Sequence, residues 1–241
     1  MTSFTDTLLG SKPLAFEKAT HHPFLQAAGD SSLKYSALLS WLGQDRLYTH
    51  AYVNFIGCLL SKIKLSSNEG ITSTLQGRII IMLGDALNNI LREITLFDNI
   101  LGSEHVSNVA DRVEPQPQTE AYTKMLREAV HPQSSLLVDL TILWGTEKCY
   151  LEAWRYAKSC NNGTGGSDSK SPPDLNSRSL LQETLIPNWT SSEFEDFVRR
   201  IEYLLNELAG HPEYANEWQD CKAIWTTILT VEEGFWPHVT Q

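Results

Sequence analysis

Two stretches of the sequence place an acidic residue beside an aromatic residue at helical spacing. Asp45 lies three residues before Tyr48, and Glu232 lies three residues before Phe235, so each pair shares one face of a helix. A carboxylate held against aromatic rings loses hydration, which raises its pKa and lets it exchange protons near neutral pH. Only one of Glu232 and Glu233 can take part, because neighbours on a helix point about 100° apart. The pattern is typical of acid or base catalysis, and such carboxylates also hydrogen-bond polar heterocycles.

A third pair, Glu147 and Tyr150, has the same spacing within a longer apolar segment. Simpler interpretations exist for these residues as well. Asp45 can lie in solvent or pair on the surface with Arg46 or His50, and the segment around Glu147 can be a core helix with one polar edge. The three pairs belong to one site only if their helices pack together.

The helices that must position these residues are indicated by apolar residues that repeat at the helical period of 3.6. The segments with this pattern are residues 31–60, 71–101, 118–131, 134–159, 191–209 and 212–236. Gly102 stands where a helix C-cap is expected, the run from Thr190 to Glu193 supplies N-cap residues, and Pro212 opens the last segment. Alternating β-branched runs with hairpin turn signals do not occur. The sequence therefore predicts an all-α protein.

Composition narrows the class of partners. The chain has 19 basic and 29 acidic residues, which gives a formal charge of −10 and argues against nucleic acid and anionic membranes as partners. No stretch approaches the roughly 18 to 20 apolar residues that a membrane helix needs, and the first residues lack the features of a signal peptide. We therefore expect a soluble, cytoplasmic protein. Its four cysteines show no zinc-binding or disulfide pattern, so we expect free thiols.

The sequence indicates one domain over residues 1–241. Its low-complexity stretch, residues 161–179, has one apolar residue and is expected to form a mobile surface loop. The chain has no sequence motif for a zinc protease, a dinucleotide or a nucleotide phosphate. A di-iron bundle needs Glu-x-x-His on two helices, and the chain has a single match, from Glu128 to His131. We expect neither a metal nor another cofactor.

Several motifs resemble those of the TenA (thiaminase-II) family. The run His22-Pro23-Phe24 and the later Gln44-Asp45-x-x-Tyr48 are similar to the opening pattern of that family. Further similar blocks, in the same order, are residues 93–102 (EITLFDNILG), 119–123 (TEAYT), 189–194 (WTSSEF) and the C-terminal Glu232 with Phe235-Trp236. The resemblance spans roughly residues 12–238. It implies a heme-oxygenase-like helical bundle that binds no haem and has an internal pocket for an aminopyrimidine.

The resemblance also implies a role for each matching residue. By position, Asp45 binds the amino group and ring nitrogen of the pyrimidine, and Phe235 packs on its ring. Tyr48 and Tyr122 line the pocket, and Glu232 is the acid and base. Members of the family hydrolyse thiamin or its degradation products. This chain is therefore expected to act on aminomethyl-pyrimidine, or on its N-formyl derivative, towards the hydroxymethyl-pyrimidine that is used in thiamin salvage.

One position departs from the cysteine-bearing branch of the family. Four residues before Tyr150, where that branch has a nucleophilic cysteine, this chain has Thr146. The chain thus resembles the branch without the cysteine, in which an acid such as Glu147 takes part in catalysis. Trp189 replaces a pocket tyrosine, and we expect both Trp189 and Tyr150 to contact the substrate. Cys149, on the same helix, is an alternative nucleophile, but we expect carboxylates to catalyse hydrolysis with water as the nucleophile.

Two other classes of function stay open. The same fold serves oxidases, including PqqC-like and di-iron members, and a protein with such a pocket can also bind a pyrimidine without turnover. The presence of both Asp45 and Glu232 favours an enzyme, because binding alone needs only Asp45. The resemblance also implies a homo-oligomer, either a dimer or a tetramer.

Overall fold

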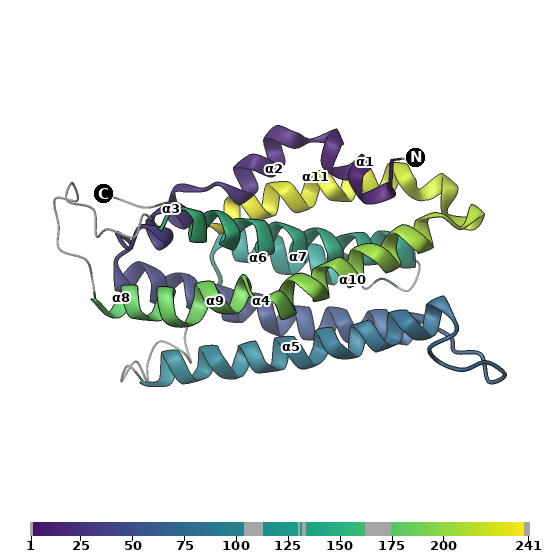
Figure 1. The fold of residues 1–241 in the computed structure, drawn as a ribbon, viewed down its shortest axis with the longest axis horizontal. Coiled ribbons are helices and arrows are strands. Elements are labelled where there is room, and N and C mark those ends of the chain that lie inside the picture. The colour runs from purple at the N-terminus through teal and green to yellow at the C-terminus, as the bar shows by residue number, and fades with distance from the viewer. Residues whose placement is uncertain (1, 104–112, 130, 132–133, 162–174, 239–241) are drawn as a thin grey trace.

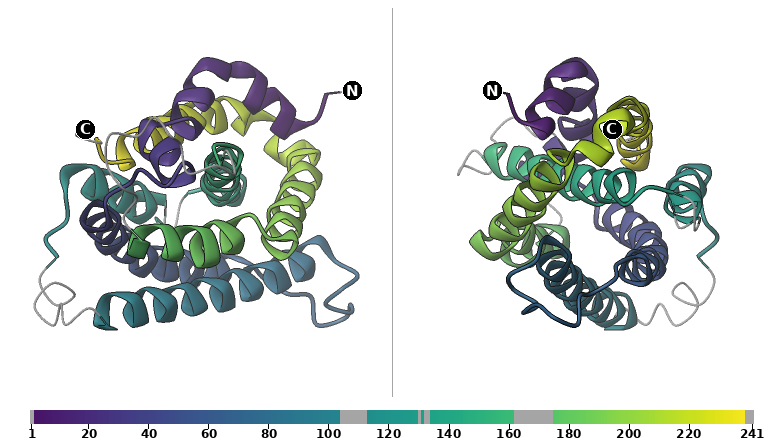
Figure 2. Two further views of the ribbon diagram at one scale, coloured as in Figure 1. Left: turned by 60° about the vertical axis from the view of Figure 1, so that its left-hand side comes forward. Right: turned by 90° about the vertical axis from the view of Figure 1, so that its right-hand side faces the viewer.

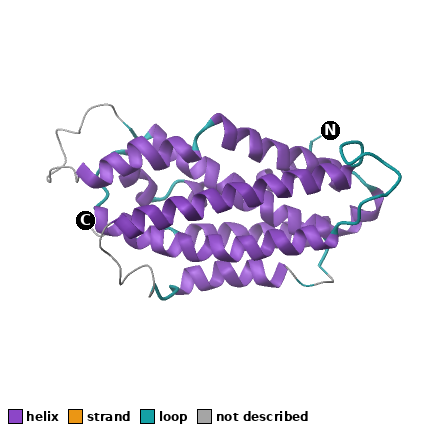
Figure 3. Ribbon diagram, turned by 90° about the horizontal axis from the view of Figure 1, so that it is seen from below, coloured by secondary structure: helices purple, strands orange, loops and turns teal. Residues whose placement is uncertain are grey.

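The computed structural model describes residues 2–238 apart from 104–112, 130, 132–133 and 162–174 (Figure 1). Every regular element in this part of the chain is a helix, and Figure 3 shows no strand among these residues. The helices form an all-α bundle of the heme-oxygenase-like type, so the predicted fold class is confirmed. Among the described helices, none combines the length and the apolar character that are needed to cross a membrane.

The six segments with helical periodicity all form long helices. These are α4 (Tyr35–Lys62), α5 (Leu75–Ser103), α6 (Pro117–Ala129), α7 (Leu136–Ser159), α10 (Ser192–Ala209) and α11 (Trp218–Phe235). The side chain of Ser191 caps α10 by accepting the N–H of Phe194 at 3.2 Å, as the cap residues predict. Two predicted ends are wrong. Gly102 lies inside the last turn of α5, and Pro212 opens a short 3₁₀ helix, η2 (Pro212–Glu217), before α11, because proline fits the first turn of either helix type.

The sequence pattern does not predict the short helices. They are α1 (Phe4–Ser11), α2 (Pro13–Thr20), α3 (Pro23–Gly29), α8 (Leu175–Ser179), the π-helical turn η1 (Leu180–Leu185) and α9 (Ile186–Trp189). None exceeds 8 residues, which is too short for a periodic pattern to be recognised. Local signals define them instead: Ser3 and Asp6 form a capping box on α1, and Pro13 and Pro23 stand at the first positions of α2 and α3.

The predicted loop at residues 161–179 needs a correction. Its last five residues form α8, whose Ser177 is fully buried, and the chain continues directly into η1. Residues 162–174 lie outside the described part of the chain. The apolar residues Leu181 and Leu185, just after the stretch, are buried and anchor this end of it. Composition alone missed the helix because α8 packs on α4, a contact between segments far apart in the sequence.

Helix α7 lies at the centre of the bundle. It packs against α2, α3, α9, α10 and α11, and Figure 2 shows these helices around it. Helix α4 packs on α5 and α6. The largest fully buried side chains are the tryptophans Trp41, Trp144, Trp154, Trp189 and Trp225, so most of the seven tryptophans belong to the core. The arrangement directs side chains of α4, α5, α7 and α11 towards a common interior.

Close contact between α3 and α7 predicts a destabilising substitution. A Cβ atom at Gly29 would lie 1.9 Å from the carbonyl oxygen of Ala157, so Gly29→Ala must push the two helices apart. We expect a loss of about 1–3 kcal/mol in the free energy of unfolding, measured by urea titration. Gly57, in the exposed interior of α4, has no neighbour within 4 Å of such an atom, and Gly57→Ala should gain about 0.5–1 kcal/mol. Equal changes in the two variants would contradict the prediction.

Candidate active site

Two carboxylates are buried in the interior of the bundle. Asp45 on α4 and Glu232 on α11 are each 1% exposed. The hydroxyl of Tyr150 donates a hydrogen bond to Oδ2 of Asp45 at 2.7 Å, and the hydroxyl of Tyr122 donates one to Oε1 of Glu232. Glu233 is exposed, so Glu232 is the glutamate that faces the interior. Each buried carboxylate therefore has a tyrosine partner from another helix.

The surface interpretation of Asp45 is wrong. Its neighbour Arg46 pairs with Asp98 on α5 at 2.6 Å, and His50 is exposed. Because Arg46 is turned by about 100° from Asp45 on the helix, the arginine reaches the surface while the aspartate faces the core.

Aromatic rings pack together beside the hydrogen-bonded pair of Tyr122 and Glu232. The centroids of Tyr48 and Tyr122 are 4.5 Å apart, and Phe235 lies 5.4 Å from Tyr122 and 6.2 Å from Tyr48. Thr146, at the position where the cysteine-bearing branch has its nucleophile, is buried, and its hydroxyl donates a hydrogen bond to the carbonyl oxygen of Leu143 at 3.1 Å. These rings come from α4, α6 and α11, so packing of the three helices builds an aromatic wall next to the carboxylate.

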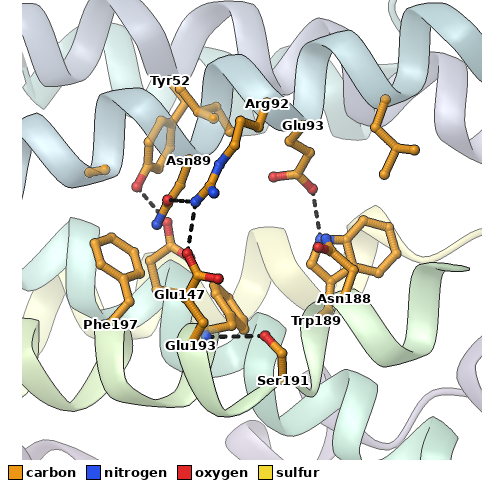
Figure 4. Close-up of a pocket in the computed structure, with 14 residues that line it drawn as sticks. Tyr52, Asn89, Arg92, Glu93, Glu147, Asn188, Trp189, Ser191, Glu193 and Phe197 are labelled. Carbon is orange, nitrogen blue, oxygen red and sulfur yellow. Dashed lines mark hydrogen bonds and ion pairs between the residues drawn. The ribbon is translucent and has the colours of Figure 1, made fainter.

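Two further carboxylates border a cavity. Glu147 on α7 accepts a hydrogen bond from the hydroxyl of Tyr52, and Oε1 of Glu93 on α5 accepts the indole N–H of Trp189 at 2.8 Å. All four side chains line a cavity of about 200 Å³ between α4, α5, α7, α9 and α10. Figure 4 shows Glu93 directed at Trp189 and Tyr52 directed at Glu147. The cavity makes Glu147 accessible from outside the buried site.

Burial raises the pKa of each of these four carboxyl groups. The pKa of Asp45 rises to about 7 and that of Glu147 to about 7, although a tyrosine hydrogen bond to each opposes the shift. Burial raises the pKa of Glu232 to about 8; the hydrogen bond from Tyr122 opposes the shift, while the charges of Asp45 and Glu147 increase it. Burial, followed by the same two charges, raises the pKa of Glu93 well above its usual range. Asp45, Glu147 and Glu232 can therefore exchange protons near neutral pH.

Cys149 has the wrong environment for an activated thiol. It is fully buried, and burial, increased by the charge of Glu232, raises its pKa well above the ordinary value for a thiol. The nucleophile in covalent catalysis is the thiolate, which this environment disfavours. The alternative in which Cys149 acts as nucleophile therefore finds no support in its electrostatics.

The described residues contain no candidate metal centre. No group of three or more histidine, cysteine, aspartate or glutamate side chains is placed there to share one ion. Glu128, from the single Glu-x-x-His match, is exposed and lies 3.6 Å from Lys124 on the same helix. This surface pair differs from the inward-facing glutamates of a di-iron bundle.

The structure brings most of the predicted site residues together. The interior holds Asp45, Tyr48, Tyr122, Tyr150, Glu232 and Phe235, and the cavity holds Glu147 and Trp189. Sequence reasoning missed Tyr52 and Glu93. Tyr52 follows Tyr48 by four residues on the same helical face, a spacing that indicates a shared site. Glu93 opens one of the family-like blocks, but nothing near it in the sequence identifies its partner Trp189.

The fold and the site define a class of protein: an all-α, heme-oxygenase-like bundle with buried carboxylates and aromatic rings at one internal site. The chain belongs to the TENA/THI-4/PQQC family, which it matches over residues 14–241. The family assignment from the sequence motifs is therefore confirmed.

Two curated relatives resemble the chain over almost all of its length. A protein of Glycine max named "Probable bifunctional TENA-E protein" is 25% identical, and the match covers 96% of this chain and 91% of the relative. A "Probable transcription factor" of Fusarium pseudograminearum is 24% identical over 99% of this chain and 52% of the relative. The chain thus spans about half the length of the Fusarium protein.

Solved structures show the same fold. A TenA homologue from Pyrococcus furiosus superposes with a TM-score of 0.76 at 21% identity, covering 97% of this chain and 98% of that one. A chain from Sulfolobus solfataricus described as a "putative tena-like thiaminase" gives a TM-score of 0.68 at 17% identity, covering 96% and 93%. At these identities the likeness is one of fold.

Proposed function

We propose that this protein is a hydrolase of aminopyrimidines derived from thiamin and that it works by carboxylate acid and base catalysis without a cysteine nucleophile. The observation that carries the proposal is the state of Glu232. Its side chain is buried and accepts a hydrogen bond from Tyr122, and burial raises its pKa to about 8. A protonated carboxylic acid in such a place can donate a proton to a leaving group. Family membership and the names of the soybean and Sulfolobus relatives support a thiamin-related substrate.

In this proposal the inner residues bind the pyrimidine. Asp45 accepts a hydrogen bond from the amino group and, in its protonated form, donates one to the ring nitrogen, and Tyr150 holds the carboxyl group in place. The rings of Tyr48, Tyr122 and Phe235 contact the faces and edge of the heterocycle. Binding the ring here places its substituent near Glu232.

The two glutamates then divide the proton transfers. Glu232 gives its proton to the amine nitrogen as the carbon–nitrogen bond breaks, so ammonia leaves. Glu147, which borders the cavity, takes a proton from water as the new carbon–oxygen bond forms. Burial raises the pKa of both carboxyl groups into the range near neutral pH, where one can hold a proton for the leaving group while the other accepts a proton from water. The position that holds the nucleophilic cysteine in the other branch of the family is Thr146 in this chain, so no thiol is present there.

The test is to incubate the purified protein with aminomethyl-pyrimidine, N-formyl-aminomethyl-pyrimidine and thiamin, and to measure ammonia, formate and the pyrimidine products. We expect release of hydroxymethyl-pyrimidine or of formate, at an unchanged rate in Cys149→Ala. Loss of activity in Cys149→Ala would establish covalent catalysis instead. If the compounds bind but none of them reacts, the protein is a pyrimidine-binding protein and the proposal fails.

A further inference from the structure

A hydrogen bond between Tyr52 and Glu147 joins helices α4 and α7 at the edge of the cavity (Figure 4). The hydroxyl of Tyr52, a residue that is 1% exposed, donates to Oε1 of Glu147. Oε2 of Glu147 accepts no hydrogen bond from the described residues, and none of their lysines, arginines or histidines forms an ion pair with this glutamate. Tyr52 therefore holds one oxygen of the carboxyl group, and the other is available to a water molecule in the cavity of about 200 Å³.

Ring contacts connect this pair with the residues around Glu232. The ring of Tyr48 lies 5.9 Å from that of Tyr52, edge to face, and 4.5 Å from that of Tyr122. The hydroxyl of Tyr122 donates a hydrogen bond to Glu232. Tyr48 thus contacts two tyrosines, each of which holds a different glutamate. The aromatic wall therefore runs by direct packing from Glu232 to Glu147, which places the acid and the base of the proposed reaction at its two ends.

Tyr52 can prepare Glu147 for catalysis without reacting itself. Burial, increased by the charge of Glu147, raises the pKa of the Tyr52 phenol well above its ordinary value, so the phenol keeps its proton and stays a donor. A hydrogen bond donated to a carboxylate favours the ionised form, and the bond from Tyr52 opposes the increase that burial causes in the pKa of Glu147. A base must be ionised to accept a proton from water, and its free oxygen must face that water. The hydrogen bond meets both requirements.

We infer that Tyr52 is a positioning residue for the proposed hydrolysis, because it orients the carboxylate of Glu147 so that Oε2 takes the proton from the attacking water. The inference rests on the proposed function and adds the residue that prepares its base. In this step an O–H bond of water breaks, its proton goes to Oε2, and the water oxygen forms the new bond to carbon. The electron pair of the carbon–nitrogen bond leaves with the amine, which Glu232 protonates, while Tyr52 keeps its own proton.

The test measures kcat and KM in the wild type, Tyr52→Phe and Tyr156→Phe, for whichever of the three compounds named above the wild type hydrolyses. Phenylalanine keeps the ring that packs on Tyr48 and removes only the hydroxyl. The control makes the same change on α7, at a tyrosine outside the cavity whose ring packs on His21. For Tyr52→Phe we expect kcat to fall about tenfold and KM to change less than about threefold, because the base loses its hydrogen bond while the wall keeps its rings. Tyr156→Phe should behave as the wild type.

The pH dependence of kcat separates positioning from a structural role. Activity should rise with pH as Glu147 ionises and fall as Glu232 loses its proton, which gives a bell-shaped profile. In Tyr52→Phe the acidic limb should move to higher pH, whereas Tyr122→Phe, which removes the hydrogen bond to Glu232, should move the alkaline limb to higher pH. A Tyr52→Phe enzyme with wild-type kcat, or a slower one whose acidic limb has not moved, would overturn the inference while turnover by the wild type upholds the proposed function.

A double variant tests directly whether Tyr52 acts through Glu147. If it does, adding Tyr52→Phe to Glu147→Gln should lower kcat by less than about twofold, although the same change lowers the wild-type kcat about tenfold. A second tenfold loss would show that Tyr52 acts elsewhere and would also overturn the inference. If the wild type hydrolyses none of the compounds, the proposed function fails and the inference fails with it.

Discussion

Glu232→Gln is expected to lower kcat for the amine substrate by about 10²- to 10⁴-fold, because glutamine fills the same space but cannot donate the proton that the leaving nitrogen needs. The amide oxygen of glutamine can still accept the hydrogen bond from Tyr122, so the aromatic wall should keep its arrangement. The measurement is steady-state hydrolysis at pH 7.5, with ammonia as the product followed. KM should change little, since Asp45 and not Glu232 holds the ring.

Two variants define what this result means. Glu233→Gln makes the same chemical change at the next residue, which is exposed, and should retain full activity. Tyr122→Phe removes the hydrogen bond that lowers the pKa of Glu232, and a more weakly acidic proton donor should reduce kcat about tenfold. A Glu232→Gln enzyme with more than a tenth of the wild-type kcat would exclude this residue as the proton donor.

The long helices could be predicted from the sequence because each buries a continuous apolar face. Helix α4 repeats this pattern over 28 residues, and its periodicity also placed Asp45 and Tyr48 on one face. For α11, helical periodicity predicts only that one of Glu232 and Glu233 faces inward. The structure shows that it is Glu232. Short helices such as α3 and α8 escape such reasoning because a cap, a proline or a neighbouring helix, and not an apolar repeat, determines them.

The contacts that complete the site join residues far apart in the chain. Glu93 is 96 residues from Trp189, and Tyr52 is 95 residues from Glu147. No local pattern encodes such a pair, since it exists only when α5 packs near α9 and α4 near α7. The sequence identifies Trp189 as the residue that replaces a pocket tyrosine. Only the structure shows that its indole N–H donates a hydrogen bond to Glu93. The raised pKa values likewise depend on burial that the whole bundle creates.

Raising the pH from 5 to 8 is expected to decrease the free energy of unfolding, and Glu232→Gln should reduce that decrease. In the unfolded chain Glu232 ionises near its ordinary pKa of 4.5, but in the folded protein it stays protonated up to a pKa of about 8. Between these values the unfolded state binds fewer protons, so stability falls by up to about 1.4 kcal/mol per pH unit for this group and levels off above pH 8. Asp45 and Glu147 add losses of the same sign up to about pH 7.

Urea unfolding followed by tryptophan fluorescence at pH 5, 6, 7 and 8 measures this slope. A glutamine at position 232 has no proton to retain, so its variant should lose less stability with rising pH than the wild type, whereas Glu233→Gln should follow the wild type. If the buried amide of the variant changes the free energy of unfolding by the same amount at every pH, the plot of stability against pH shifts as a whole and its slope stays the same. Parallel curves for Glu232→Gln and the wild type would mean that the acid is already ionised when folded. The expected outcome, a variant that is inactive yet less sensitive to alkaline pH, would show that the same burial that destabilises the fold gives Glu232 its proton for catalysis.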